Sequence, residues 1–587
     1  MQPGNPDKRL RIFTAIIVVI AVFFVGRLFQ VQVLMADEIN KESLASRSVS
    51  QVLPALRGEI LDSTGKVLAK SVLKYDINAS PKDVAPMQKT VDGVTVELPV
   101  SQLVAQIAGI LAMTPEDVAT KIAGTTNFAN IKRGVDSKTY DQLRKLNIPW
   151  LYYDKRSSRT YPSGAVAGSL LGFLNPDGEP FGGIESQYDK CLAGQDGTES
   201  FEKSEDWVKI PDSVVTTTDA VNGRSVHLTI NADLQYFAQQ VLAQNVAKLR
   251  ADWATAVVIE VKTGKILVAA EAPTMDPNAP GKTDASTRQA RVFETTFEPG
   301  SVIKTVTAAT LVDQQKATPA TQTIAPYSWK VPGTNGYKVT DSHFHPDDKL
   351  TLTGVLRDSS NTGIMKLGQA VEAKTRFDYL VKFGMGTKSG LNFPGEAKGF
   401  VLPFDQWDGI KKYVSMFGQG FSMTPLQTAM MYQAIANKGV SLPPVLVQGC
   451  EDASGKLVAA STKPGTRVIS ESTAKSTVDM LEKVVEQGGI GKRAGVPGYR
   501  VGGKSGTAEI IDKATGRYGN LYAISFIGMA PAEDPQYVVA VTAYKSRTIR
   551  NSLGAVPIFK DIMQQVLRTF RIAPSTTTSV KIPTEWR

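Results

Sequence analysis

An uncharged apolar run at positions 12–26 is the strongest hydrophobic pattern in the sequence, and three basic residues stand shortly before it. Continued through 27–34, the run reaches the roughly 20 residues that a membrane-crossing helix needs, if Arg27 places its charge at the interface. A cleaved secretory signal is the alternative, but no small-residue cleavage site follows closely. Because basic flanks stay in the cytoplasm, the pattern predicts a cytoplasmic tail at 1–11, a single-pass anchor at 12–34 and an extracytoplasmic remainder.

After the anchor, apolar and polar positions alternate only in short runs. The run 58–62 reads as a strand, and Ser63, Thr64 and Gly65 break it as turn residues. The stretch that follows is rich in glycine, proline and charged residues. The short strand-like runs and this composition predict an extended, mostly-β, non-catalytic module over 35–219.

Over 220–573 the periodicity becomes clearer. Helical spacing of apolar residues covers 232–249, and the alternating runs 254–261 and 265–270 flank the short turn 262–264 of a hairpin. Further strands and a closing helix are expected at 225–230, 523–529, 537–544 and 556–570. Strands from both ends of this module predict an antiparallel sheet flanked by helices, with an inserted helical lobe. The predicted fold class is a multi-domain α+β protein.

Two smaller features complete this outline. Residues 574–587 begin with a run of serine and threonine and are predicted to form a flexible tail, because such residues bury little apolar surface. Cys191 and Cys450 are the two cysteines of the chain. Export would permit a disulfide between them, but they fall in different predicted modules, so we interpret both as small buried residues.

Composition narrows the chemistry. Two cysteines and three histidines leave little room for a zinc site, and His343 and His345 are interpreted as loop residues, so we expect no metal and no cofactor. The 66 basic and 56 acidic residues give a net charge of +10 without a long block of one sign. Nucleic acid is therefore not expected, and an anionic envelope or wall is the more natural partner.

The strongest candidate for catalysis is Ser301-Val302-Ile303-Lys304, which follows a Pro-Gly turn at the expected start of a helix. Lys304 falls one turn after Ser301 on the same face. A serine hydroxyl is a weak nucleophile, and a lysine that is desolvated in a cleft can be neutral enough to take its proton. The helix start adds backbone N–H groups where an oxyanion would form.

The Ser-x-x-Lys pattern alone proves little, because it also occurs elsewhere in the chain, as at Ser63–Lys66, Ser71–Lys74 and Ser472–Lys475. After Ser301, Ser359-Ser360-Asn361 follows 58 residues later and Lys504-Ser505-Gly506-Thr507 follows 203 residues later, and no other occurrence has both partners in that order and at that spacing. The alternative for Ser301 is an N-cap serine beside a solvated lysine. The three elements together favour a catalytic serine.

The segment 498–505 also satisfies the phosphate-binding P-loop pattern. A P-loop needs a buried strand before it and a helix after it, whereas here a glycine-rich loop precedes and a strand with a turn follows. In such a strand Ser505 and Thr507 face one way, and Gly506 leaves room for a substrate backbone. Lys504 would offer a cation to a carboxylate.

These elements resemble those of the class B penicillin-binding proteins, which are monofunctional transpeptidases that share their catalytic domain with serine β-lactamases. The resemblance covers almost the whole chain. Its other motifs are Arg57-Gly58-Glu59-Ile60-Leu61-Asp62, Arg159-Thr160-Tyr161-Pro162-Ser163-Gly164, Gly183-Ile184-Glu185, Leu192-Ala193-Gly194-Gln195-Asp196-Gly197 and Phe417-Gly418-Gln419-Gly420 with Thr424-Pro425-Leu426-Gln427. The second element is Ser-Ser-Asn where many relatives have Ser-Asp-Asn, and the third is Lys-Ser-Gly where many have Lys-Thr-Gly. The resemblance implies a pedestal and dimerisation module at 35–219 and a transpeptidase domain at 220–573.

By this resemblance, Ser301 attacks the penultimate D-Ala carbonyl of a peptidoglycan stem peptide and releases the terminal D-Ala. An amine of a neighbouring stem then resolves the acyl-enzyme. Lys304 would be the base, and Ser359 would pass the proton to the leaving amine. Asn361 would hold the substrate amide and Lys304.

The third element would bind the terminal carboxylate through Lys504, Ser505 and Thr507, beside Gly506. Backbone N–H groups of Ser301 and Thr507 would form the oxyanion hole. β-Lactams would acylate the same serine.

Within this family the motif at 159–164 and the short cytoplasmic tail resemble the division branch, and an elongation-specific transpeptidase is the alternative. Expected partners are stem peptides, β-lactam antibiotics, a SEDS-family glycosyltransferase, divisome membrane proteins and the membrane itself. A membrane-tethered β-lactam receptor or scaffold, and a β-lactamase, are alternatives from other classes. Intact Ser301, Lys304 and Lys504 argue against an inactive scaffold, and a sensor would need a longer cytoplasmic part.

Overall fold

The computed structural model describes every residue except 1–5, 92–93, 203–212, 214–215, 462, 488–490 and 513–514. Residues 1–5 of the predicted cytoplasmic tail thus lie outside the described residues. The chain forms two compact units that interleave along the sequence. Unit 1 comprises Met1–Leu56, Val72–Ser158 and Gly194–Asn222, and unit 2 comprises Arg57–Ser71, Arg159–Ala193 and Gly223–Arg587. The sequence suggested a single boundary near residue 219, whereas the chain passes between the units several times.

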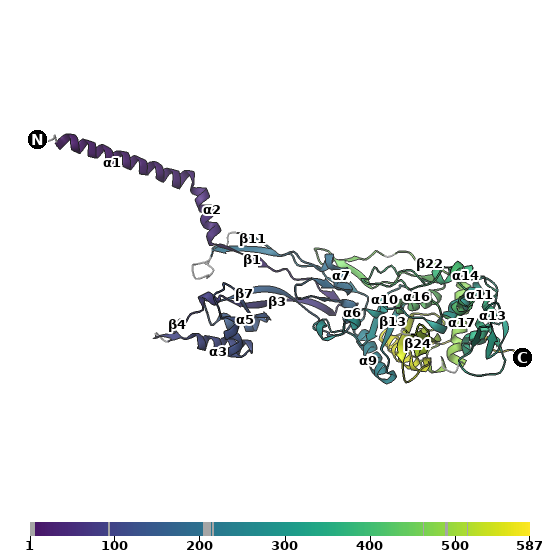
Figure 1. Ribbon diagram of the computed structural model, residues 1–587. Coiled ribbons are helices and arrows are strands. Elements are labelled where there is room, and N and C mark those ends of the chain that lie inside the picture. The colour runs from purple at the N-terminus through teal and green to yellow at the C-terminus, as the bar shows by residue number, and fades with distance from the viewer. Residues whose placement is uncertain are drawn as a thin grey trace. The chain divides into compact units, whose positions relative to one another are not determined.

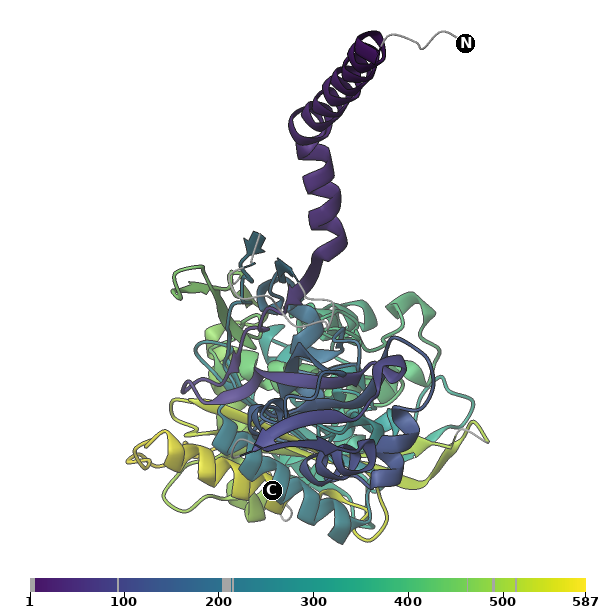
Figure 2. The ribbon, with the colours of Figure 1, turned by 90° about the vertical axis from the view of Figure 1, so that its left-hand side faces the viewer.

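The N-terminal apolar segment is helical, as predicted. Helix α1 (Pro6–Phe29) continues through a π-helical turn (Gln30–Leu34) to α2 (Ala36–Arg47), and Figure 2 shows the bend between the two helices. None of the described side chains of α1 is buried. The stretch Pro6–Leu34 has 29 residues, and an 18-residue window within it has a mean hydropathy of 2.7, which makes it long and apolar enough to cross a membrane.

Unit 1 combines antiparallel strands with a small helical layer. One of its sheets contains β1 (Ser48–Leu53), β10 (Gly197–Glu202) and β11 (Thr216–Thr218). Helices α3 (Val100–Leu111), α4 (Pro115–Lys121) and α5 (Ser137–Arg144) share an apolar cluster with β6 (Ala129–Val135). The sequence reading missed these helices, although Thr114 and Asp136 give local start signals. Each of these side chains accepts a hydrogen bond from a backbone N–H of the first turn.

Three of the motifs before the catalytic domain meet around one buried carboxylate in unit 2. The oxygens of Glu185, which is fully buried, lie 2.6 Å from Arg57 Nε and 2.7 Å from Arg159 Nε. Tyr161 donates its hydroxyl proton to the same carboxylate (3.2 Å). Removing one partner of a buried ion pair typically costs about 3–5 kcal/mol, because a charge is left uncompensated. These motifs therefore hold together the segment that leads into the catalytic domain.

A five-stranded antiparallel sheet forms the centre of unit 2, in the order β14-β13-β25-β24-β23. Its strands are β13 (Trp253–Glu260), β14 (Ile266–Ala272), β23 (Gly502–Ile511), β24 (Tyr518–Ala530) and β25 (Tyr537–Ser546). The predicted hairpin between the first two strands is confirmed. The other three strands come from the far end of the domain, so the predicted sheet built from both ends is confirmed as well.

Helices cover both faces of this sheet (Figure 1). One set of alternating strand side chains packs against α9 (Ala232–Leu249) and α18 (Val556–Thr569). The other set packs against α11 (Lys304–Asp313) and α16 (Pro425–Ala436). Both α9 and α18 match their predicted ranges closely.

The predicted helical lobe is confirmed. Helices α12 (Leu352–Asp358), α13 (Asn361–Gly368) and α17 (Glu471–Gln487) share a second apolar cluster with α11. Helix α11 contributes to both clusters because successive residues around it face the sheet and the lobe. The start of α11 therefore lies at the junction of the two layers.

The interpretation of the two cysteines is wrong. Cys191 in α8 (Asp189–Leu192) and Cys450 in β20 (Val447–Glu451) form a disulfide, with their Cα atoms 6.4 Å apart. β12 (Val226–Leu228) pairs with β20, and Arg224, two residues before β12, donates its N–H to the Cys191 carbonyl (2.9 Å). Separation in sequence suggested different modules, but both residues lie in unit 2.

The segment 574–587 is ordered, in contrast to the flexible tail that its composition suggests. Thr351 donates its N–H to Thr584 O (3.0 Å), and Trp586 donates its N–H to Lys349 O (3.1 Å). Thr584 is only 9% exposed. Hydrogen bonds to the rest of unit 2 hold this segment, and composition does not reveal them.

Candidate active site

The 3₁₀ turn η5 (Gly300–Ile303) carries the candidate nucleophile directly before α11. Lys304 Nζ lies 3.0 Å from Ser301 Oγ. Residues i and i+3 eclipse each other in a 3₁₀ turn, so the Ser-x-x-Lys spacing stacks the lysine beside the serine. Behind the turn, a Cβ at Gly418 would lie 2.0 Å from Gly300 O, so the motif that contains Gly418 can pack there only with glycine.

Lys304 is the centre of the hydrogen-bond network. The side chain is fully buried, and its Nζ donates to Ser359 O (2.5 Å), Ser359 Oγ (3.2 Å) and Asn361 Oδ1 (2.7 Å). Ser359 ends α12 in the left-handed conformation (φ +60°), which turns both of its oxygens toward this lysine. Burial lowers the pKa of Lys304 to about 7, against the opposing charge of Asp341. A large share of the side chain is therefore neutral near pH 7 and able to accept a proton.

Asp341 was not singled out in the sequence, yet it organises the second element. Its buried carboxylate accepts hydrogen bonds from Ser360 Oγ (2.6 Å) and from the backbone N–H groups of Asn361 (2.6 Å) and Thr362 (3.1 Å). His345 Nε2 lies 3.2 Å from the same carboxylate, in a loop as predicted. A negative charge at the start of α13 also complements the helix dipole. No local spacing links Asp341 to this element, so no sequence signal could have found it.

The third element lies on β23, and the strand is followed by a turn and β24 rather than by a helix. This arrangement contradicts a P-loop, as the sequence reading expected. Lys504 is fully buried, and burial together with the nearby charge of Lys304 lowers its pKa. Ser505 is buried and Thr507 is half-buried on the same strand.

Two glycines bring β23 against the turn that carries the serine. A Cβ at Gly506 would lie 2.9 Å from Val302 Cγ1, and a Cβ at Gly300 would lie 2.8 Å from Thr507 O. Such contacts are too close for a real side chain, so glycine permits the approach. All the predicted site residues thus lie on η5, at the start of α11, on β23 or at the junction of α12 and α13.

A cleft of about 390 Å³ opens beside the far end of β23. Phe400, Glu298, Glu509 and Tyr518 are among its lining residues. Glu298 accepts hydrogen bonds from Gly420 N (3.1 Å) and from the Tyr518 hydroxyl (3.1 Å), and burial raises its pKa. The cleft is large enough for a peptide side chain and has both polar and apolar walls.

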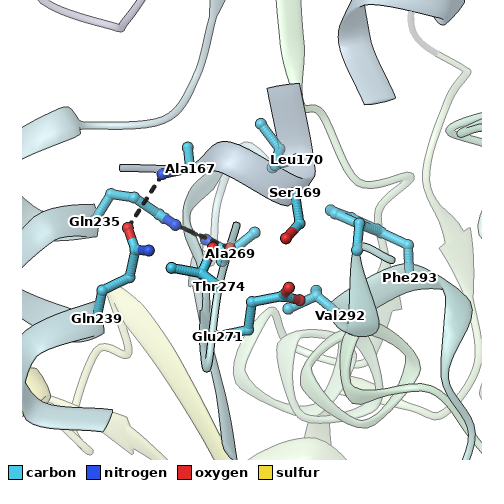
Figure 3. Close-up of a pocket in the computed structure, with 11 residues that line it drawn as sticks. Ala167, Ser169, Leu170, Gln235, Gln239, Ala269, Glu271, Thr274, Val292 and Phe293 are labelled. Carbon is cyan, nitrogen blue, oxygen red and sulfur yellow. Dashed lines mark hydrogen bonds between the residues drawn. The ribbon is translucent and has the colours of Figure 1, made fainter. Parts of the chain in front are cut away.

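A second, much smaller cavity of about 10 Å³ lies elsewhere in unit 2, and Figure 3 shows Gln235, Ser169 and Glu271 around it. Burial raises the pKa of Glu271 to about 7, and its carboxylate accepts the backbone N–H of Arg291 (2.7 Å). A space of this size holds no more than about one water molecule. It is therefore not a substrate site.

The site has a serine, a buried lysine one turn later, a second serine with an asparagine, and a strand that carries a lysine. This combination defines a serine acyltransferase of the penicillin-binding type. The family described as penicillin binding protein transpeptidase domain matches residues 254–564, and the penicillin-binding protein dimerisation domain matches residues 52–179.

Similar proteins give the same assignment. Penicillin-binding protein PbpB of Mycolicibacterium smegmatis is 32% identical over 584 residues, covering 95% of this chain and 89% of the relative. Peptidoglycan D,D-transpeptidase FtsI of Escherichia coli is 31% identical over 576 residues, covering 97% and 93%. The chain therefore belongs to the class B penicillin-binding proteins, as the sequence motifs indicated.

Solved structures share the fold. Penicillin-binding protein 3 of Mycobacterium tuberculosis, crystallised with aztreonam, matches with a TM-score of 0.69 and 28% identity, covering 92% of this chain and all of that one. A peptidoglycan synthetase of Bifidobacterium adolescentis matches with a TM-score of 0.71 and 29% identity over the same shares. The predicted fold class is confirmed, and the apolar N-terminal helix fits a membrane-anchored enzyme.

Proposed function

We propose that this protein is a peptidoglycan D,D-transpeptidase of septal wall synthesis that β-lactams acylate. The proposal rests above all on Lys304, whose Nζ lies 3.0 Å from Ser301 Oγ and whose pKa is lowered to about 7. The name of the relative FtsI and the structures of a relative with aztreonam and ampicillin support it.

In acylation, neutral Lys304 takes the Ser301 proton while Oγ attacks the carbonyl carbon of the penultimate D-Ala. Backbone N–H groups of Ser301 and Thr507 stabilise the oxyanion. The C–N bond then breaks, and Ser359 relays the proton from Lys304 to the leaving amine of the terminal D-Ala. In the second half-reaction an amine of a neighbouring stem gives up a proton along the same route and attacks the ester. The new amide forms and the Ser301 hydroxyl is restored.

The third element binds the donor peptide in this proposal. Lys504, Ser505 and Thr507 hold the terminal carboxylate, and Gly506 lets the peptide backbone approach the strand. A charged lysine is costly to bury, and a substrate carboxylate would stabilise its charge directly. Asn361 holds the substrate amide while it accepts a hydrogen bond from Lys304 (2.7 Å).

The orientation belongs to the same proposal. Basic residues precede the apolar run, which favours a cytoplasmic N-terminus and an extracytoplasmic catalytic domain. The Cys191–Cys450 disulfide supports this orientation, because such bonds persist in oxidising compartments. We assign residues 1–11 to the tail, 12–34 to the anchor, 35–219 to the pedestal and 220–573 to the transpeptidase domain. A SEDS-family glycosyltransferase and divisome membrane proteins are the proposed partners.

Acylation of the full-length protein in detergent tests the mechanism. A fluorescent penicillin should form a stable adduct that mass spectrometry places on the Ser301 peptide. Ser301→Ala should abolish the adduct, whereas Ser472→Ala, in another Ser-x-x-Lys sequence, should leave it unchanged. An adduct that persists in Ser301→Ala would refute the assignment, and rapid hydrolysis of the adduct would point to a β-lactamase.

Localisation of a fluorescent fusion in growing cells tests the division role. We expect the signal at the septum. A purely lateral-wall signal would favour the elongation-specific alternative.

A further inference from the structure

The segment 575–586 follows α18 and lies along unit 2 outside any long helix or strand; we call it the strap. The residues that it contacts include Arg500, Lys483, Thr351, Gly354, Arg357 and Lys349. These residues come from both the sheet side and the helical lobe of the catalytic domain. The strap therefore connects two parts of the domain that carry different elements of the active site.

The strap contacts and hydrogen-bonds the first turn of α12. Thr351, the N-cap of this helix, donates its N–H to Thr584 O (3.0 Å) and its hydroxyl to Pro583 O (2.7 Å). A Cβ at Gly354 would lie 1.9 Å from Thr584 O, so the strap backbone touches the helix backbone here. The start of α12 is thus held by hydrogen bonds and by direct packing.

The strap also binds the last turn of α12. Arg357 donates from Nη1 to Thr584 Oγ1 (2.7 Å), and its Nη2 lies 2.7 Å from Glu585 Oε1. Asp358 at 2.6 Å completes the set of partners of this guanidinium, and these carboxylates raise the pKa of Arg357. The next residue after α12 is Ser359, whose two oxygens accept hydrogen bonds from Lys304.

The other end of the strap reaches the segment that leads into β23. Arg500, two residues before this strand, donates its N–H to Ser575 Oγ (2.9 Å) and its Nη1–H to Thr577 Oγ1 (2.7 Å). The same guanidinium makes a bidentate ion pair with Glu482 of α17 (2.6 and 2.7 Å). Between the two ends, Lys483 donates to Ser579 Oγ (2.9 Å).

We propose that the strap positions Ser359 for acyl transfer by fixing α12 relative to β23. This inference rests on the proposed function, because it concerns the proton relay at Ser301. A helix of seven residues has little stability of its own, so the position of Ser359, which caps its C-terminal end, depends on the contacts that fix the helix. Displacing a catalytic group by about 1 Å can cost about 100-fold in rate. Arg357 and Thr584 are positioning residues in this proposal.

The test uses the full-length protein in detergent and a protein that ends at Ile582. We expect the truncation to lower the second-order rate constant for acylation by fluorescent penicillin by about tenfold or more. The loss should fall on the first-order acylation step rather than on the dissociation constant of the β-lactam. Arg357→Lys and Thr584→Val should lower it less, and Lys581→Ala, an exposed position on the same strap, should not lower it.

The pH profile separates positioning from stability. The Ser359 oxygens favour the charged form of Lys304, so a displaced Ser359 lowers the pKa of this lysine and moves the rising limb of the acylation rate to lower pH. Lost stability alone reduces the amount of protein that reacts and leaves the limb in place. If the truncated protein does not fold, Arg357→Lys and Thr584→Val give the same readout.

If the truncated protein shows an unchanged rate constant for acylation and an unchanged pH profile, the inference is overturned. If the truncated protein does not fold, the same result in both point variants would overturn it. So would a loss of reacting protein at an unchanged rate constant. Failure of the proposed function would look different, because the full-length protein itself would then form no adduct on Ser301.

Discussion

At the residue scale, burial changes the chemistry of two lysines that the sequence shows only as cations. The side chains of Lys304 and Lys504 are both fully buried and out of contact with water. Desolvation disfavours the ammonium form, so the pKa of each falls below its usual value. Lys304 contacts the serine and suits a base, whereas Lys504 lies on the strand proposed to hold the substrate carboxylate.

The pKa of Lys304 predicts how acylation depends on pH. Since the base must be neutral, the second-order acylation rate constant should rise about tenfold per pH unit below pH 7 and level off above it. Stopped-flow measurements with a fluorescent penicillin between about pH 5 and pH 9 check this. A flat profile across pH 7 would show that Lys304 is not the titrating base.

Asp341 gives a second prediction. Asp341→Asn replaces a carboxylate that accepts hydrogen bonds from Ser360, Asn361 and Thr362 at the start of α13 with a weaker, uncharged acceptor, at a cost of about 1.5–3 kcal/mol. The acylation rate should fall about 10–100-fold, and the rising limb should move to lower pH because the Asp341 charge raises the pKa of Lys304. The neighbouring exposed variant Asp347→Asn is the control. If the acylation rate is the same in the two variants and rises over the same pH range in both, this role for Asp341 is contradicted.

At the element scale, long periodic patterns were predicted well and short capped elements were not. The apolar spacing over 232–249 matches α9 to the residue, since eighteen residues average out single exceptions. Helices α3 to α5 have 7 to 12 residues and were missed, because packing in unit 1 rather than a long amphipathic pattern stabilises them.

The disulfide links two elements that the sequence placed in different modules, α8 and β20. The double variant Cys191→Ala/Cys450→Ala should lose about 2–4 kcal/mol of unfolding free energy, because the unfolded chain is no longer cross-linked. Thermal unfolding with and without reductant checks this, and reductant should have no effect on the double variant. Free thiols in the protein isolated from the cell envelope would contradict the bond.

At the scale of the whole molecule, the anchor and the active site are chemically independent. The contacts described around Ser301 come from residues after position 297, and the apolar helix ends at Leu34. Deleting residues 1–34 should therefore move the protein from the membrane fraction to the soluble fraction and leave the acylation rate of Ser301 within about twofold. Cell fractionation and penicillin labelling measure both effects. A folded deletion variant that loses acylation, or that stays with the membrane, would contradict this independence.

The sequence by itself determined the apolar anchor, the sheet whose strands come from both ends of the catalytic domain, and the set Ser301, Lys304, Ser359 and Lys504. These features depend on the period of apolar residues and on the order of motifs, which are both properties of the sequence. Only the tertiary structure decided the roles of Asp341, the Cys191–Cys450 bond and the 575–586 strap. Each of these depends on a contact between residues that are far apart in sequence or without a shared motif. Such contacts arise when strands and helices pack, and no spacing along one chain encodes which distant polar group will be buried beside another.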